Sequence, residues 1–275
     1  MQNEGQSSLY LNRFSIVLAF LALGFAMVYL LPVKVEASAL IILGIRFQIS
    51  FFNAIPVLLA LLAAVGGVWV FLTHPVWSYE KVSYLRILPH LMLPFISTLI
   101  LAIVLRQSAR SQIWWVVFLT GYMIVALLFR AEYVLIEETG ITSLGYSILV
   151  NSFSFGLFLL LTIALKNSSV RMIAQFLLLF LSSLFVSFRL LTLQKSFGDN
   201  LLLALLVSWI VTQLAVGLHY IFIPPIQYGL LLTGILYSLS SWLSQFKAEK
   251  KWHQYPEPIL MSFVTILVIV ISLVV

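Results

Sequence analysis

Long runs of apolar residues, separated by short polar segments, dominate the chain. A membrane-spanning helix needs about 20 mostly apolar residues. Backbone groups in hydrocarbon must be hydrogen-bonded within the segment, so each run is predicted to be helical. The runs predict nine spans: Phe14–Leu31, Asn53–Leu72, Ile87–Leu105, Ile113–Phe129, Tyr146–Leu165, Met172–Leu193, Leu201–Ile223, Tyr228–Phe246 and Ile259–Val275.

The connections between these runs are too short to hold a soluble domain. We therefore predict an all-α integral membrane protein, a polytopic bundle of about nine transmembrane helices with a range of eight to ten. Residues 1–275 are expected to form a single transmembrane domain. The last span, which ends at Val275, is the main source of the range.

One stretch between the first two runs departs from the helical pattern. Apolar and polar residues alternate in Val33–Ala37 and again in Ile45–Phe51, which follows Gly44. Alternation with period two and β-branched or aromatic residues is typical of strands. The pattern predicts a short strand-like hairpin near residues 33–51 on one membrane face, with an interfacial amphipathic helix as the alternative.

Composition supports the membrane class and narrows the chemistry. The chain is 62% hydrophobic and 9% charged, whereas soluble domains carry about 25% charged residues. It has no cysteine, which excludes thiolate catalysis, thiolate zinc sites and disulfides. The formal net charge is +6, but the basic residues are scattered between apolar runs. This arrangement is typical of loops that flank membrane spans, so the expected partners are membrane lipids and membrane proteins, with no nucleic acid.

Ionisable residues at membrane depth are functional hypotheses, because charges are costly in hydrocarbon. They are His90, Arg130, Glu132, Arg189 and His219. If the fourth predicted span continues past Phe129, then Arg130 and Glu132 enter the bilayer near one interface. The alternating direction of the spans puts Arg189 at the same face, which predicts a Glu132–Arg189 ion pair. The alternative is that both side chains extend to the interface from helix ends.

The seventh predicted span carries a polar stripe. Ser208, Thr212 and His219, with Gln213 beside them, fall near one helical face, and Asn151 and Ser154 on the fifth span are natural partners. Such a stripe either bonds to neighbouring helices or presents His219 to a ligand or a pigment metal, and packing is the commoner role. His90 lies between Pro89 and Pro94 and is a weaker candidate for an axial ligand.

Motifs for catalysis are absent from the sequence. It contains no H-E-x-x-H, G-x-S-x-G, Walker A or G-x-G-x-x-G pattern. We therefore predict no catalytic residues, no metal site and no required cofactor, with a hydrophobic pigment or quinone as the ligand class that stays compatible. Similar helix pairs at residues 103–130 and 163–189 leave an internal repeat open.

Three short signatures carry a resemblance to a known family. They are the segment Leu31–Ser50, the dipeptide His74-Pro75 after the second run, and the tripeptide Ala131–Tyr133. On these residues the chain resembles an uncharacterised family of bacterial multi-pass membrane proteins. The resemblance implies an integral membrane protein of unknown function, expected in the cell inner (cytoplasmic) membrane.

Three functions follow from these observations as hypotheses. The first is a non-catalytic subunit or accessory protein of a membrane complex, binding lipid, quinone or pigment between helices. The second is a small permease, which the number of spans and the kinking prolines favour. The third is an intramembrane lipid-modifying enzyme using Glu132, Arg189 and His219. We rank the first highest, because a transport path or an active site has few polar residues from which to be built.

Overall fold

The structure is a computed structural model of the whole chain. It describes residues 2–30, 38–42, 45–49, 51–72, 74, 84–108, 111–136, 141–168, 172–192, 197–247, 259–260, 262–265 and 267. The described residues divide between two compact units, Met1–Tyr146 and Ser147–Val275. The expectation of one transmembrane domain over residues 1–275 stays a prediction.

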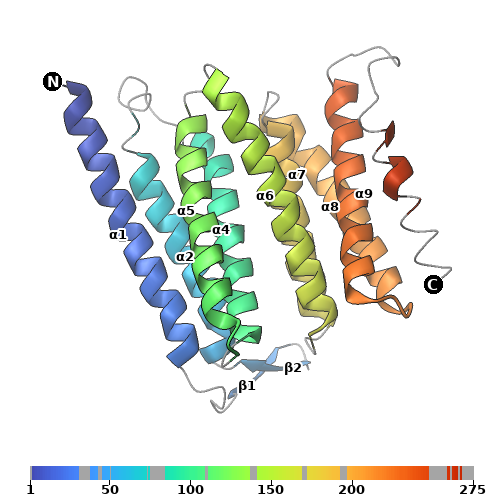
Figure 1. The fold of residues 1–275 in the computed structure, drawn as a ribbon. Coiled ribbons are helices and arrows are strands. Elements are labelled where there is room, and N and C mark those ends of the chain that lie inside the picture. The colour runs from blue at the N-terminus through green and yellow to red at the C-terminus, as the bar shows by residue number, and fades with distance from the viewer. Residues whose placement is uncertain are drawn as a thin grey trace. The chain divides into compact units, whose positions relative to one another are not determined.

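The described part of the first unit contains four long helices and a pair of strands, which Figure 1 labels. The helices are α1 (Gln2–Leu30), α2 (Phe51–Phe71), α4 (Tyr84–Gln107) and α5 (Trp114–Leu135). Helix α4 packs against α1, α2 and α5, and α1 also packs against α2. Successive helices run in opposite directions (Figure 1), so the end of α2, the start of α4 and the end of α5 share one end of this unit.

The strands lie between α1 and α2. Strand β1 (Ser38–Ile42) pairs antiparallel with β2 (Ile45–Ile49), and Ile42 lies opposite Ile45 at the turn. The second strand occupies the predicted position, whereas residues 33–37 lie outside the described residues. The location of this pair on a membrane face stays a prediction.

The second unit contains the larger part of α6 (Ile141–Lys166), followed by α7 (Met172–Thr192), α8 (Phe197–His219) and α9 (Pro225–Lys247). Helices α7, α8 and α9 pack against one another. The Phe155 ring of α6 meets the Tyr237 ring of α9 edge-on, with centroids 4.9 Å apart. Contacts of this kind join α6 to the rest of the unit.

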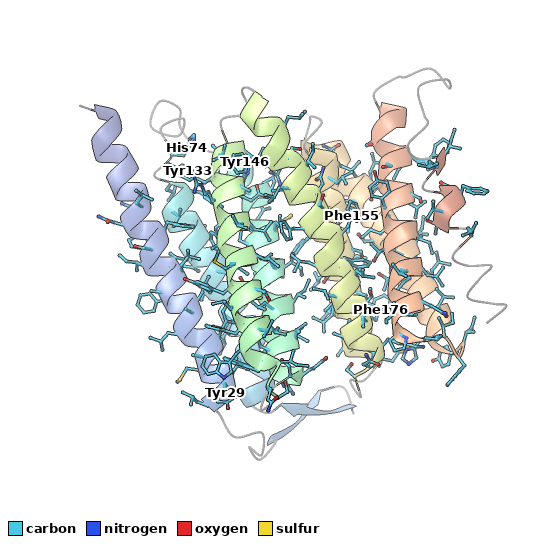
Figure 2. The ribbon with its side chains drawn as sticks, in the orientation of Figure 1. Tyr29, His74, Tyr133, Tyr146, Phe155 and Phe176 are labelled. Carbon is cyan, nitrogen blue, oxygen red and sulfur yellow. The ribbon has the colours of Figure 1, made fainter. Side chains whose placement is uncertain are left out.

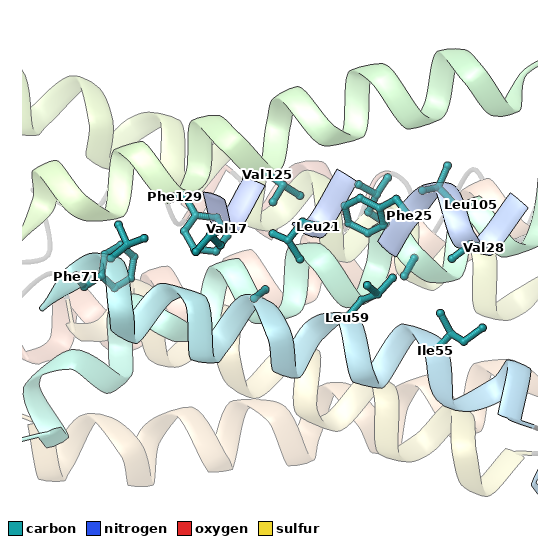
Figure 3. Close-up of a cluster of buried hydrophobic side chains, with 14 of the residues drawn as sticks. Val17, Leu21, Phe25, Val28, Ile55, Leu59, Phe71, Leu105, Val125 and Phe129 are labelled. Atoms are coloured by element: carbon teal, nitrogen blue, oxygen red, sulfur yellow. The ribbon is translucent and has the colours of Figure 1, made fainter. Parts of the chain in front are cut away.

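Packing in the first unit depends on two adjacent glycines of α2. A Cβ atom at Gly66 would lie 2.6 and 2.9 Å from the two methyl groups of Val17 on α1. A Cβ atom at Gly67 would lie 2.8 Å from Leu91 on α4. Small residues let membrane helices approach closely, so this glycine pair allows α1 and α4 to pack on α2. The core that results is formed by apolar side chains such as Leu21 and Phe129 (Figure 3).

Seven described helices are long and apolar enough to cross a membrane. They comprise Leu11–Leu30, Ala54–Phe71, Ile87–Gln107, Trp114–Leu135, Leu144–Lys166, Met172–Leu191 and Asn200–His219. The count of nine spans, and its range of eight to ten, is therefore not confirmed. The predicted span Tyr228–Phe246 lies in α9, which is helical but carries several serines in its second half. Much of the predicted span Ile259–Val275 lies outside the described residues.

Candidate functional site

Ionisable and aromatic side chains gather at one end of the first unit. His74 follows the end of α2, His90 lies six residues into α4, and Glu132 lies three residues before the end of α5. Figure 2 shows His74 and Tyr133 at this end of the unit, and Tyr29 at the opposite end. At about 1.5 Å per residue, His90 and Glu132 lie within roughly 10 Å of the ends of their helices.

The centre of this site is a pair formed by His90 and Glu132. The Nδ1 atom of His90 lies 2.9 Å from Oε2 of Glu132. The Glu132 side chain is fully buried, while that of His90 is 13% exposed. A buried carboxylate is costly unless a hydrogen-bonded partner compensates it, so the imidazole stabilises Glu132. The pair also links α4 to α5 directly.

Prolines shape the backbone around His90. Proline has no N–H group, so Pro94 leaves the carbonyl oxygen of His90, one helical turn earlier, without its usual donor. The carbonyl of Pro94 itself accepts hydrogen bonds from the hydroxyls of Ser97 at 3.0 Å and Thr98 at 2.7 Å. Both hydroxyls therefore bond within α4, as is common for Ser and Thr in membrane helices.

Aromatic rings surround the pair. The Phe71 ring of α2 meets the His90 ring edge-on, with centroids 6.5 Å apart, and it also lies 6.2 Å from the Phe129 ring. Beside them, the buried His74 meets the Tyr133 ring edge-on at 4.7 Å. The site is thus lined by apolar rings on the side of α2. An imidazole paired with a carboxylate can accept or release a proton, and this is the chemistry that the geometry supports.

Sequence reasoning singled out His90 and Glu132 but did not pair them. It placed Arg189 opposite Glu132 because both belong to the same predicted membrane face. The alternating direction of the spans also puts the start of α4 at that face, so the same argument could have identified His90 as a partner of Glu132. Arg189 is buried on α7 of the second unit, and the Glu132–Arg189 pair stays a prediction. Arg130 is exposed on α5, and His74, which the structure places in the site, was not among the predicted site residues.

The predicted polar stripe of α8 is helical and mostly buried. The Ser208 hydroxyl donates to the Ala204 carbonyl, and the Thr212 hydroxyl donates to the Ser208 carbonyl, both at 2.6 Å. His219 is half-buried at the end of α8, and Asn151 is half-buried on α6. The two hydroxyls therefore bond to their own helix, as is common for Ser and Thr in membrane helices. A ligand-binding role for Asn151 and His219 stays a prediction.

Lys166 donates hydrogen bonds at the C-terminal end of α8, and it was not among the predicted site residues. The Nζ atom of Lys166 donates to the carbonyls of His219 at 3.1 Å and Ile221 at 3.5 Å. It also lies 5.0 Å from the centroid of the Tyr228 ring, and the Tyr228 hydroxyl donates to the Ala215 carbonyl at 3.2 Å. A basic side chain satisfies the free carbonyls of a helix end. The sequence does place Lys166 at the start of a short connection between two predicted spans, and that position could have identified it as a residue near helix ends.

Metal ligands are sparse in the described part of the chain. No group of three or more His, Cys, Asp or Glu side chains there is placed to hold a metal ion. The His90–Glu132 pair supplies two such side chains.

The helices define the class of the protein: it is a helical, apolar protein of the membrane type, and seven helices among its described residues are long and apolar enough to cross a bilayer. The chain belongs to the family described as Protein of unknown function (DUF5656), which matches residues 33–272. This supports the expectation of an uncharacterised family, while the bacterial origin stays a prediction. No curated protein and no solved structure matches the chain.

Proposed function

We propose that this protein is a non-catalytic integral membrane protein that acts as a subunit or accessory protein of a membrane complex. The main support is the way its buried hydroxyl groups are used. Nine of them donate to a carbonyl three or four residues earlier in the same helix: those of Ser97, Thr98, Ser154, Thr162, Ser182, Ser183, Ser208, Thr212 and Ser244. A hydroxyl engaged in this way does not present its proton to a substrate.

An apolar ligand between helices is the second part of this proposal. Tyr29 lies at the end of the first unit opposite His74 (Figure 2), and aromatic rings form a continuous cluster there. Trp114 stacks on Phe118 with ring centroids 5.2 Å apart, and Phe118 stacks on Tyr122 with centroids 6.2 Å apart. Tyr29 and Trp115 lie at its edge and are 37% and 60% exposed. Flat exposed rings stack well on another ring. This supports a ligand with a flat ring, such as a quinone or a pigment, and a lipid stays the alternative. The inner (cytoplasmic) membrane is the proposed location.

Purification from native membranes in a mild detergent tests this proposal. We expect the chain to migrate with other membrane proteins in a native gel, and mass spectrometry to identify them at a constant ratio. An absorption spectrum and a lipid extract of the same sample test for the ligand. The matched control is an unrelated membrane protein with the same tag. A chain that purifies alone, colourless and free of bound ligand would contradict the proposal.

A small permease is the second candidate, because the buried His90–Glu132 pair resembles the proton-binding groups that transporters place in membrane helices. Four hydroxyls in the second unit add support, since they are buried without a hydrogen-bond partner: those of Ser187, Thr233, Ser238 and Ser240. Ser187 and Ser240 each lie 15 residues from the start of their helices, α7 and α9. Because α7 and α9 run in the same direction (Figure 1), both hydroxyls lie the same number of residues from the same end of the unit.

Proton flux into liposomes separates the two candidates. The permease predicts a flux that Glu132→Gln abolishes, because an amide cannot release a proton at neutral pH. Arg130→Gln, two residues away and on an exposed side chain, is the control and should keep the flux. Our proposed function predicts no flux for any of the three proteins. A substrate-dependent flux lost only in Glu132→Gln would overturn it.

A further inference from the structure

Gln213 is an exposed polar residue within a long apolar helix. It lies in the membrane-spanning part of α8, Asn200–His219, six residues before its end. At about 1.5 Å per residue, the side chain is roughly 9 Å from the nearer end of the span. Gln213 is nevertheless exposed, and its amide has no hydrogen-bond partner among the described residues. An amide facing hydrocarbon without a partner is strongly unfavourable.

The surroundings of Gln213 form one exposed helical face. Leu206, Trp209 and Gly217 lie seven and four residues before it and four after it, which places them on the same side of a helix. Leu206 and Trp209 are 49% and 55% exposed. A Cβ atom at Gly217 would meet no atom within 4 Å. We call these four residues the α8 outer face.

We infer that the α8 outer face binds the same face of a second copy of this chain within the membrane. This inference rests on the proposed function, that the protein is a subunit of an assembly. Polar amides and small residues are the two features that drive association between membrane helices. Here Gln213 and Gly217 lie one helical turn apart, so the glycine allows close approach where the amide needs a partner.

The chemistry of the amide selects a second copy as the occupant. An amide side chain carries both a donor and an acceptor, so two glutamines can exchange a pair of hydrogen bonds. Two copies inserted in the same direction are related by a two-fold axis along the membrane normal, and each residue near the axis meets its own equivalent. Gln213 then meets Gln213 at the same depth. A lipid chain offers nothing that this amide can bond to.

Single-cysteine cross-linking tests the inference directly. The chain has no cysteine, so Gln213→Cys and Leu206→Cys each introduce the only thiol. A disulfide needs Cα atoms about 4.4–6.8 Å apart. We expect oxidation of native membranes to give a band at twice the 31.0 kDa chain mass for both variants. Leu214→Cys is the control, because Leu214 is 41% exposed at the same depth but about 100° around the helix, and it should stay monomeric.

Each other outcome overturns the inference. No cross-linked band for Leu206→Cys, which keeps the Gln213 amide, or an equal band for Leu214→Cys, shows that α8 does not present this face to a second copy. A cross-link to a protein of another mass identifies a different partner. The proposed function is judged separately: copurifying proteins without the dimer would support the function alone, and the dimer without them would support the inference alone.

A conservative variant gives a second measurement that does not depend on oxidation. Gln213→Leu keeps the apolar volume but removes the hydrogen bonds, so the dissociation constant of the dimer should rise roughly 10-fold. Energy transfer between two fluorescent fusions, followed over a series of protein-to-lipid ratios, measures it. Leu214→Ala should leave the constant unchanged. An unchanged constant for Gln213→Leu would contradict the role of the amide.

Discussion

Replacing His90 by alanine is expected to lower the free energy of unfolding by about 3 kcal/mol. The reason is that Glu132 is fully buried, and its Oε2 atom lies 2.9 Å from the imidazole. Removing one member of a buried pair takes away part of the compensation of the remaining charge, and such losses typically cost about 3–5 kcal/mol. The lower end applies because His90 is 13% exposed, so water can reach the vacated position. Unfolding in mixed micelles, followed by tryptophan fluorescence, measures the change.

A double variant tests whether the loss comes from the pair. His90→Leu together with Glu132→Leu removes both members of the pair, and such a double replacement is often nearly neutral. We therefore expect it to be more stable than His90→Leu alone. The control is Arg130→Ala, a change on an exposed side chain that should stay within about 0.5 kcal/mol. If the single and double variants are equally unstable, the two side chains do not act as a pair.

Replacing Gly66 by leucine is expected to lower the free energy of unfolding by about 2–3 kcal/mol. A Cβ atom at this position would already lie 2.6 and 2.9 Å from both methyl groups of Val17. Valine is restricted to one main rotamer in a helix, so it cannot turn away, and α1 must move off α2. The same micelle titration measures this loss, and a cross-link between α1 and α2 would report the separation.

The matched control is Gly156→Leu on α6. A Cβ atom at Gly156 would meet no atom within 4 Å, so its stability should change by no more than about 0.5 kcal/mol. Adding Val17→Ala to Gly66→Ala should recover stability relative to Gly66→Ala alone, because it removes the methyl groups that collide. Equal effects of leucine at positions 66 and 156 would show that α1 does not pack on α2 through this glycine.

The class of this protein and much of its helix order follow from the sequence, because membrane helices are specified by the local sum of hydrophobicity. Seven of the predicted runs coincide with helices that can cross a membrane. The eighth predicted span, Tyr228–Phe246, shows where the local sum of hydrophobicity does not decide whether a helix crosses the membrane. Helix α9 forms as predicted, yet Ser238, Ser240 and Ser241 make it less apolar, and its serines lie buried against protein. The packing of these serines against protein explains how α9 can carry them, which its composition alone does not show.

From the sequence alone, Glu132 lies in a membrane helix only if the span predicted to end at Phe129 continues, and α5 does continue to Leu135. Only the tertiary structure decided that His90 is its partner and that Gln213 faces outward while Ser208 and Thr212 are buried. These outcomes depend on the rotation of each helix about its axis. Rotation is set by packing between side chains distant in sequence, such as Val17 against Gly66, and hydropathy along one chain contains no measure of it.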